Sequence, residues 1–323
     1  MKSRKKEAVS VGLAASTLAL LGTGLVTEQK RGEMAGLARV SEAQPDADLF
    51  RDLIPSDWDL PSDRNERIDF FIDFLSGQRH EDMREWLERV GMYGPMIRAE
   101  LRARDMPEDL LFLALIESGF DSNAYSPAHA VGVWQFISET GQRYGLEVSR
   151  YVDERRDPVK STAAALTYLQ QMHDRFDSWF LASAGYNTGE NRVGRIMREV
   201  TGSELGTDAD YWRIADRLPR ETRDYVPLMI AAAHIAKNPE AHGFLDLQFQ
   251  EPLRFATVQV PGGTALADVA EAAGVPLDGV VYLNAHLVLQ QTPPGRAWDV
   301  RIPEGAQGAF TANFPGEGTT APG

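Results

Sequence analysis

The 323-residue sequence contains no cysteine. This absence excludes a disulfide framework, a zinc–thiolate site, a cysteine nucleophile and the lipid-modified cysteine of a bacterial lipoprotein. The six histidines are scattered, and no helically spaced pair of them flanks a glutamate, so nothing in the sequence supports a metal site. A glycine-rich nucleotide loop is missing too. We therefore expect no metal and no other cofactor.

Positive charge is scarce. The sequence has 33 Lys and Arg against 47 Asp and Glu, which gives a formal net charge of -14. The acidic residues are spread along the chain and do not form a block, a pattern typical of a solvated protein surface. We therefore expect no nucleic-acid partner.

The one long apolar run lies at the N-terminus. It extends from Ala8 to Val26 and follows a cluster of lysine and arginine between residues 2 and 6, which favours an export signal. No clean small-x-small cleavage site follows, so we expect residues 1–30 to be a signal peptide or a signal anchor in the inner membrane. The rest of the protein is then placed in the periplasm or cell envelope.

Residues 31–65 are polar, acidic and interrupted by Pro45, Pro55 and Pro61, which predicts a linker. The segment 66–245 has apolar residues at helical spacing and almost no strand-like alternation, so it predicts a nearly all-helical domain. Helices are expected within the ranges 66–104, 107–117, 158–176, 179–186, 192–200 and 223–237.

One predicted helix is apolar on all sides. Residues 110–116 are all apolar, a pattern that indicates a helix buried in the core, and Glu117 follows directly. Burial among apolar groups raises the pKa of a carboxyl by roughly two units in well-studied glycosidases, so that it can act as a general acid near neutral pH. The alternative is that Glu117 is a solvated residue at a helix end.

Three further stretches combine aromatic, glycine and amide residues: Ala130–Ile137, Ala184–Gly189 and Thr222–Pro227. Aromatic faces stack on sugar rings, and Gln and Asn amides hydrogen-bond hydroxyl and N-acetyl groups, so such stretches are typical of glycan clefts.

Taken together, these motifs carry a resemblance. Glu117-Ser118, Gly132-Val133-Trp134-Gln135 and Ala184–Gly189, in this order, resemble the soluble-lytic-transglycosylase domain of glycoside hydrolase family 23. Residues 157–162 and 221–227 are similar to the membrane-bound lytic murein transglycosylase D subgroup. The resemblance spans roughly residues 65–240 and implies a lysozyme-like helical fold. Gly185 and Thr188 stand where many members of the family have alanine.

The resemblance also implies an activity: non-hydrolytic cleavage of the bond between N-acetylmuramic acid and N-acetylglucosamine in peptidoglycan strands, with 1,6-anhydro ends as products. Glu117 would be the catalytic residue. The resemblance implies that Ser118 and Gln135 hold substrate groups, that Asn187 orients the N-acetyl group or sugar hydroxyls, and that Tyr186 and Tyr225 position the carboxyl. Trp134 is a further candidate for substrate binding. Alternatively, the two tyrosines are core aromatics and residues 187–189 only a turn.

Two other functions stay open. Asp121 and Glu190 are the nearest other acids to these motifs, and a second carboxylate with a positioned water would make the protein a goose-type lysozyme-like hydrolase. A protein without activity could instead bind the wall as a scaffold.

A change of pattern marks a second domain at residues 252–306. A strand is expected at residues 255–260, helices at 266–273 and 277–283, and a closing strand at 298–302. This βααβ unit resembles a LysM glycan-binding module, although Pro261 and Gly263 depart from the family's usual residues in the binding loop. The module either anchors the enzyme on glycan or packs against the catalytic domain. Residues 307–323 are expected to be a disordered tail.

Overall fold

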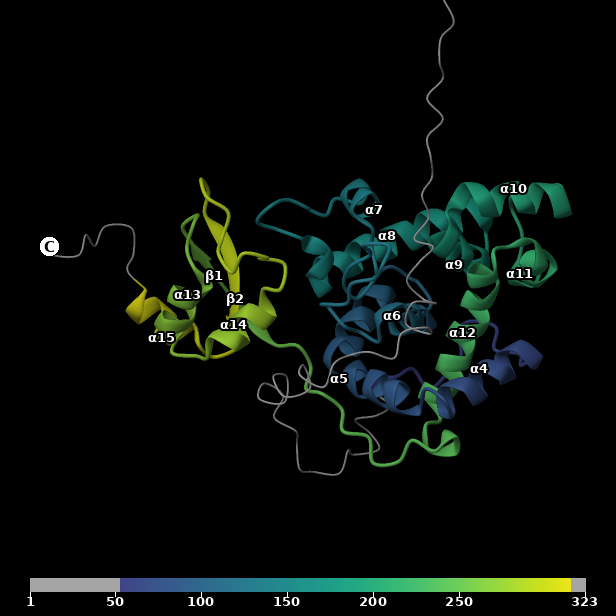
Figure 1. Cartoon of the computed structure of the whole chain (residues 1–323), viewed down its shortest axis with the longest axis horizontal. Helices are drawn as coiled ribbons and strands as arrows, with labels where there is room; N and C mark the ends of the chain where they lie inside the picture. Colours follow the sequence, from purple (N-terminus) through teal and green to yellow (C-terminus); the bar gives the residue numbers. More distant parts are fainter. Residues whose placement is uncertain (1–52, 315–323) are drawn as a thin grey trace, which may run out of the picture.

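The computed structural model describes residues 53–314. The predicted export segment, 1–30, lies outside the described residues, as does most of the predicted linker. The predicted fold class is confirmed: the described chain is mainly helical, and its one named sheet consists of two strands near the C-terminal end. Figure 1 shows the helical part on one side and the small βααβ unit beside it.

The helical domain contains every element that precedes the sheet. Its α-helices are α4 (Glu66–Ser76), α5 (His80–Arg102), α6 (Leu111–Ser118), α7 (Ser138–Arg143), α8 (Pro158–Phe176), α9 (Trp179–Thr188), α10 (Glu190–Thr201), α11 (Asp208–Ile214) and α12 (Arg220–Lys237). Short 3-10 turns connect them at η2 (Glu108–Leu110), η3 (Glu154–Arg156), η4 (Ala215–Arg217) and η5 (Glu240–His242).

Helix α6 lies in the middle of this domain, against α5 and α12 (Figure 1). All eight of its residues are buried, as the uninterrupted apolar pattern predicts. Local sequence also fixes neighbouring helix starts. The Asp157 side chain accepts hydrogen bonds from the first backbone N–H groups of α8, where Pro158 occupies the first turn, and Ser178 caps α9 in the same way.

Two helices of this domain, α7 and α11, were not predicted. They have six and seven residues, and α7 has only one buried residue, Gly141. Helices this short present too few apolar residues for a periodic pattern. Helix α11 is nevertheless marked by a capping box, in which Thr207 and Asp210 satisfy each other's backbone N–H groups.

The prediction of a linker over residues 31–65 is wrong for its described part. Leu53, Ile54 and Leu60 are buried in the core of the helical domain. Asp59 accepts hydrogen bonds from the backbone N–H groups of Glu108, at 2.5 Å, and Asp109, at 3.1 Å, just before α6. Isolated apolar residues among polar ones have no periodicity, so this packing could not be seen in the sequence.

The βααβ unit folds around a second hydrophobic cluster. Strand β1 (Phe255–Val260) pairs antiparallel with β2 (Trp298–Pro303), with Val258 opposite Val300, and α13 (Leu266–Ala273) and α14 (Leu277–Leu283) lie between them in sequence. The predicted tail at 307–323 is wrong for its first residues. They form α15 (Gln307–Asn313), because Phe310 is buried in this cluster.

The Asp59 contact predicts a pH dependence of stability. The pKa of Asp59 is raised to about 6, first by burial and then by the negative charge of Asp109. A carboxyl with a raised folded pKa contributes full stability below its unfolded pKa, and this contribution is lost as the pH rises through about 6. Asparagine keeps the capping oxygen but cannot ionise.

Asp59→Asn should therefore gain stability over the unaltered protein as the pH rises from 4.5 to 7.5. The expected gain is about 1 kcal/mol, because solvent screens part of the shift at this partly exposed side chain. Urea unfolding at both pH values measures it, with Asp57→Asn, an exposed neighbour, as the control. An equal difference at both pH values would contradict the prediction.

Candidate functional site

Glu117 occupies the last turn of α6 and its side chain is fully buried. The helix ends at Ser118. The next residue, Gly119, caps it with a left-handed φ of 59° and an N–H that donates to the Leu115 carbonyl at 2.8 Å. An added Cβ at Gly119 would lie 2.0 Å from Cδ1 of Trp86. Glycine is therefore required directly after Glu117-Ser118, both for the turn and for the close packing of α5.

Tyr225 on α12 is the hydrogen-bond donor to this carboxyl. Its hydroxyl donates to Oε1 of Glu117 at 2.5 Å, and its ring is fully buried. The pKa of Tyr225 is raised well above its ordinary value, first by burial and then by the negative charge of Glu117. Tyr225 therefore keeps its proton, and remains a donor, over the whole physiological pH range.

A proline two residues after Tyr225 is accommodated by another tyrosine. Pro227 lies inside α12 and has no N–H to offer the Arg223 carbonyl one turn earlier. The buried Tyr211 hydroxyl donates to that carbonyl at 2.7 Å. The freed acceptor is thus satisfied, and the turn that carries Tyr225 is tied to α11.

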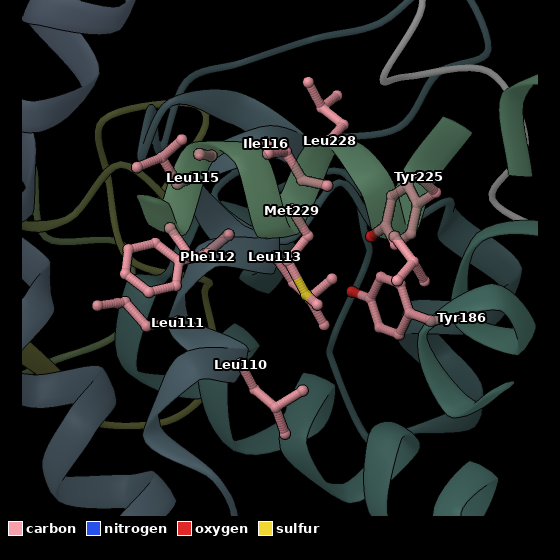
Figure 2. Close-up of a cluster of buried hydrophobic side chains, with 14 of the residues drawn as sticks. Leu110, Leu111, Phe112, Leu113, Leu115, Ile116, Tyr186, Tyr225, Leu228 and Met229 are labelled. Atoms are coloured by element: carbon pink, nitrogen blue, oxygen red, sulfur yellow. The ribbon is translucent and has the colours of Figure 1, made fainter. Parts of the chain in front are cut away.

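Tyr186 on α9 lies beside Tyr225. In Figure 2 the hydroxyls of the two tyrosines are on the same side of their rings. The Tyr186 hydroxyl donates to the Trp134 carbonyl at 2.8 Å, and the pKa of Tyr186 is raised by burial and by the negative charge of Glu117. Tyr186 therefore connects α9 to the loop after α6 while lying close to the carboxyl.

That loop, residues 119–137, is held by side chains at several points. The Ser118 hydroxyl donates to the Val133 carbonyl at 2.9 Å. Gly132 has a φ of 80°, and an added Cβ would lie 2.0 Å from the Arg155 carbonyl. The buried Arg155 guanidinium donates to the carbonyls of His129 and Phe136, at 3.0 and 3.1 Å. The loop therefore has one tightly fixed path around Glu117.

The structure places Trp134 in the core. Its side chain is fully buried, and its indole N–H donates to the Thr162 hydroxyl of α8 at 2.9 Å. Contact of this ring with a sugar stays a prediction. An aromatic residue next to an amide occurs both in cores and in cleft walls, so the residue pattern could not separate the two.

The other predicted binding residues are also buried and engaged. Gln135 has a φ of 47° and its amide donates to the Gly132 carbonyl at 2.8 Å. Asn187 accepts a hydrogen bond from the Thr222 hydroxyl at 2.8 Å and donates to Glu221 at 3.5 Å. Direct contact of Ser118, Gln135 and Asn187 with a substrate stays a prediction.

Neither of the two other candidate acids has a contact with Glu117 among the hydrogen bonds described. Asp121 accepts from the N–H of Asn123 at 2.8 Å, and Glu190 forms an ion pair with Arg143 at 3.2 Å and accepts from Tyr168. Sequence reasoning gave no individual role to Arg155, Thr222 or Glu221. Glu221 and Thr222 were visible as the start of the 221–227 motif, whereas Arg155 had no local signal.

Within residues 53–314, no group of three or more His, Cys, Asp or Glu is placed to hold a metal ion.

Comparison with known proteins agrees with this geometry. Residues 94–205 match the family model described as the transglycosylase SLT domain, and residues 254–315 match the one described as the LysM-like domain of lytic transglycosylase MltD. Both predicted resemblances are confirmed. The chain therefore carries an SLT domain that includes Glu117 and a LysM-like domain that includes the βααβ unit.

Two known proteins align with part of this chain. The chain is 38% identical over 198 residues to membrane-bound lytic murein transglycosylase D of Escherichia coli K12, an alignment that covers 61% of this chain and 43% of the relative. It is 36% identical over 118 residues to a putative tributyltin chloride resistance protein of an Alteromonas species. That alignment covers 36% of this chain and 57% of the relative. The chain thus spans less than half the length of the first of these relatives.

The turn after Glu117 yields a stability test. Gly119→Ala should destabilise the protein by about 1–2 kcal/mol from the left-handed backbone alone, and by more because the methyl group overlaps Trp86. Gly202→Ala is the matched control, since Gly202 has a φ of 84° but open space around its Cα. Chemical denaturation compares the two variants. Equal losses of stability would mean that the contact with Trp86 has no role.

Proposed function

We propose that this protein is a lytic transglycosylase of peptidoglycan, which cleaves the β-1,4 bond between N-acetylmuramic acid and N-acetylglucosamine and leaves 1,6-anhydromuramic acid ends. The observation that carries the proposal is the buried carboxyl of Glu117, which lies within the matched SLT region, residues 94–205, and accepts a hydrogen bond from Tyr225 on α12. The relative from Escherichia coli is a murein transglycosylase by name, which supports the same substrate class.

One carboxyl is enough for this reaction. Burial among apolar side chains, and the negative end of a helix, both favour the neutral form of a carboxyl. Glu117 would donate its proton to the glycosidic oxygen as the bond to the anomeric carbon breaks, and the neighbouring N-acetyl group would stabilise the positive charge. The resulting carboxylate would then take the proton of the muramyl 6-hydroxyl as that oxygen bonds to the anomeric carbon. No water is consumed.

A hydrolase is the nearest alternative. Inverting hydrolysis needs a second carboxylate about 6.5–9.5 Å from the acid to activate a water. The Asp121 and Glu190 side chains have structural partners, which favours the intramolecular route. A catalytically inactive wall-binding scaffold is disfavoured because Glu117 and its tyrosine donor are both present.

The cellular setting follows from the substrate. Peptidoglycan strands would be the partner, which places the protein in the periplasm or cell envelope, and the LysM-like domain supports contact with the wall. Residues 1–30 would direct export and either be removed or remain in the inner membrane.

Within the part of the chain that the structure describes, none of the helices combines the length and the apolar character needed to cross a bilayer.

Product analysis tests the proposal. The unaltered protein should release muropeptides with 1,6-anhydro ends from purified sacculi, detected by mass spectrometry. Glu117→Gln, which keeps shape but cannot transfer the proton, should lower the rate by at least about 10²-fold. Asp121→Asn is the matched control and should retain activity. Reducing ends in the product would identify a hydrolase, and sacculus binding without any product would identify a scaffold.

The donor to Glu117 gives a second test. Tyr225→Phe removes one hydroxyl, leaves the carboxyl without this partner and should lower kcat about tenfold to hundredfold by allowing the carboxyl to leave its productive position. Tyr211→Phe removes the α11 hydroxyl that donates to the same turn of α12 and does not touch the carboxyl, so it is the control for stability effects. Steady-state kinetics on glycan strands measure both variants, and an unchanged kcat for Tyr225→Phe would rule out the positioning role.

A further inference from the structure

The LysM-like domain is joined to the catalytic domain by a buried ion pair. Arg301 on β2 donates to both carboxylate oxygens of Asp157, at 3.0 and 2.8 Å, across 144 residues of sequence. The side chains of Arg301 and Asp157 are only 12% and 1% exposed. Removing one partner of such a pair leaves a buried charge without compensation. The contact therefore fixes one position of the module.

The same carboxylate begins helix α8. Asp157 Oδ1 accepts hydrogen bonds from the backbone N–H groups of Val159 and Lys160, at 2.9 and 3.1 Å. One turn later, Thr162 accepts the indole N–H of Trp134. Trp134 is also the residue whose carbonyl receives the Tyr186 hydroxyl. A single carboxylate thus links the module to the loop around Glu117.

A second link runs through the backbone. The Asp153 N–H donates to the His286 carbonyl at 2.8 Å, and the Val288 N–H donates to the Tyr151 carbonyl at 3.1 Å. Between them, Val152 is fully buried in the hydrophobic cluster of the module. The catalytic domain therefore packs directly against the module segment that follows α14.

This backbone link also leads to the loop. Asp153 forms a two-pronged ion pair with Arg155, with both distances 2.8 Å. Arg155 in turn holds the carbonyls of His129 and Phe136. Both connections from the module end on the same loop, residues 119–137, whose path is fixed around Glu117.

The charge of Asp157 at this contact is balanced by Arg301 and not by His286. His286 lies 3.6 Å from Asp157, and its pKa is lowered to about 4, first by burial, with Arg301 and Lys160 also lowering it while Asp157 and Glu154 oppose them. At neutral pH His286 is uncharged. Arg301 is then the cation that neutralises Asp157 from the module side.

We propose that the LysM-like module is a positioning element of the catalytic centre, in which Arg301, through Asp157, holds α8 and the 119–137 loop in place around Glu117. The module then determines kcat. Glycan binding by the segment after α14, which contacts the catalytic domain, is not its main role. Arg301 is a positioning residue, because it touches neither Glu117 nor the expected substrate site. This inference rests on the proposed transglycosylase function.

The test compares two arginines of the same module in the full-length protein. Arg301→Met removes the buried cation. Arg296→Met is the matched control, because Arg296 is 63% exposed and pairs with Glu147 across the same interface at 3.3 Å. We expect Arg301→Met to lower kcat about tenfold to hundredfold with little change in KM on uncrosslinked glycan strands, as for a catalytic group displaced by about an ångström. Arg296→Met should match the unaltered protein.

A further variant separates positioning from simple loss of folding. Asp157→Asn with Arg301→Met leaves no buried unpaired charge, and asparagine caps a helix as well as aspartate, so this double variant should fold even where the single one does not. Its kcat, measured per folded molecule well below the unfolding temperature, should also be lowered. Arg301→Lys keeps the charge and should recover part of the rate.

The outcomes are distinguishable. An unchanged kcat in the folded variants would overturn the inference, as would a raised KM with unchanged kcat, which would assign Arg301 to glycan binding. If the unaltered protein releases no anhydro products in the same assay, the proposed function itself fails.

Discussion

A carboxyl group that ends a fully buried helix is the constraint on which the helical domain depends. Burying an ionisable group without a hydrogen-bond partner costs several kcal/mol, and α6 has no polar side chain before Glu117 to supply one. The partner comes from 108 residues later, where Tyr225 on α12 donates to the carboxyl. That helix in turn contains Pro227, so Tyr211 must supply the donor that the proline lacks. Each requirement thus creates the next, and together they fix α6, α11 and α12 against one another.

The polar residues of the motifs mostly serve the backbone around this carboxyl. The carbonyls of Val133 and Trp134 receive hydroxyl donors from Ser118 and Tyr186, and Gln135 donates to Gly132 in a left-handed turn. A loop with buried carbonyls needs such donors, since water does not reach them. A motif that looks like a set of sugar contacts is therefore, in this structure, first a set of supports that give the loop one conformation. Precise placement of a single proton donor is what a one-carboxyl mechanism requires.

Local patterns predicted what local forces determine. The apolar run before Glu117, the Asp157-Pro158 start of α8 and the βααβ order were all visible, because periodicity and capping act within a few residues. The burial of Trp134 could not be predicted, because the same residue types line cores and clefts. The docking of residues 53–60 and of Phe310 depends on single apolar residues that meet surfaces formed elsewhere in the chain. Contacts such as Asp59 with Asp109 join distant segments, and no short-range pattern can specify them.

The contact between the two domains illustrates how polarity can specify a geometry that apolar packing leaves open. Val152 supplies an apolar anchor, but apolar surfaces tolerate small shifts at little cost because the hydrophobic effect has no direction. The pair of Arg301 and Asp157 does not, because one guanidinium nitrogen, Nη2, must reach both carboxylate oxygens and a lost partner leaves a buried charge. Such a pair adds little net stability compared with apolar residues. Its presence at the first turn of α8 is explained by the need for one fixed orientation, which is also what the loop around Glu117 requires.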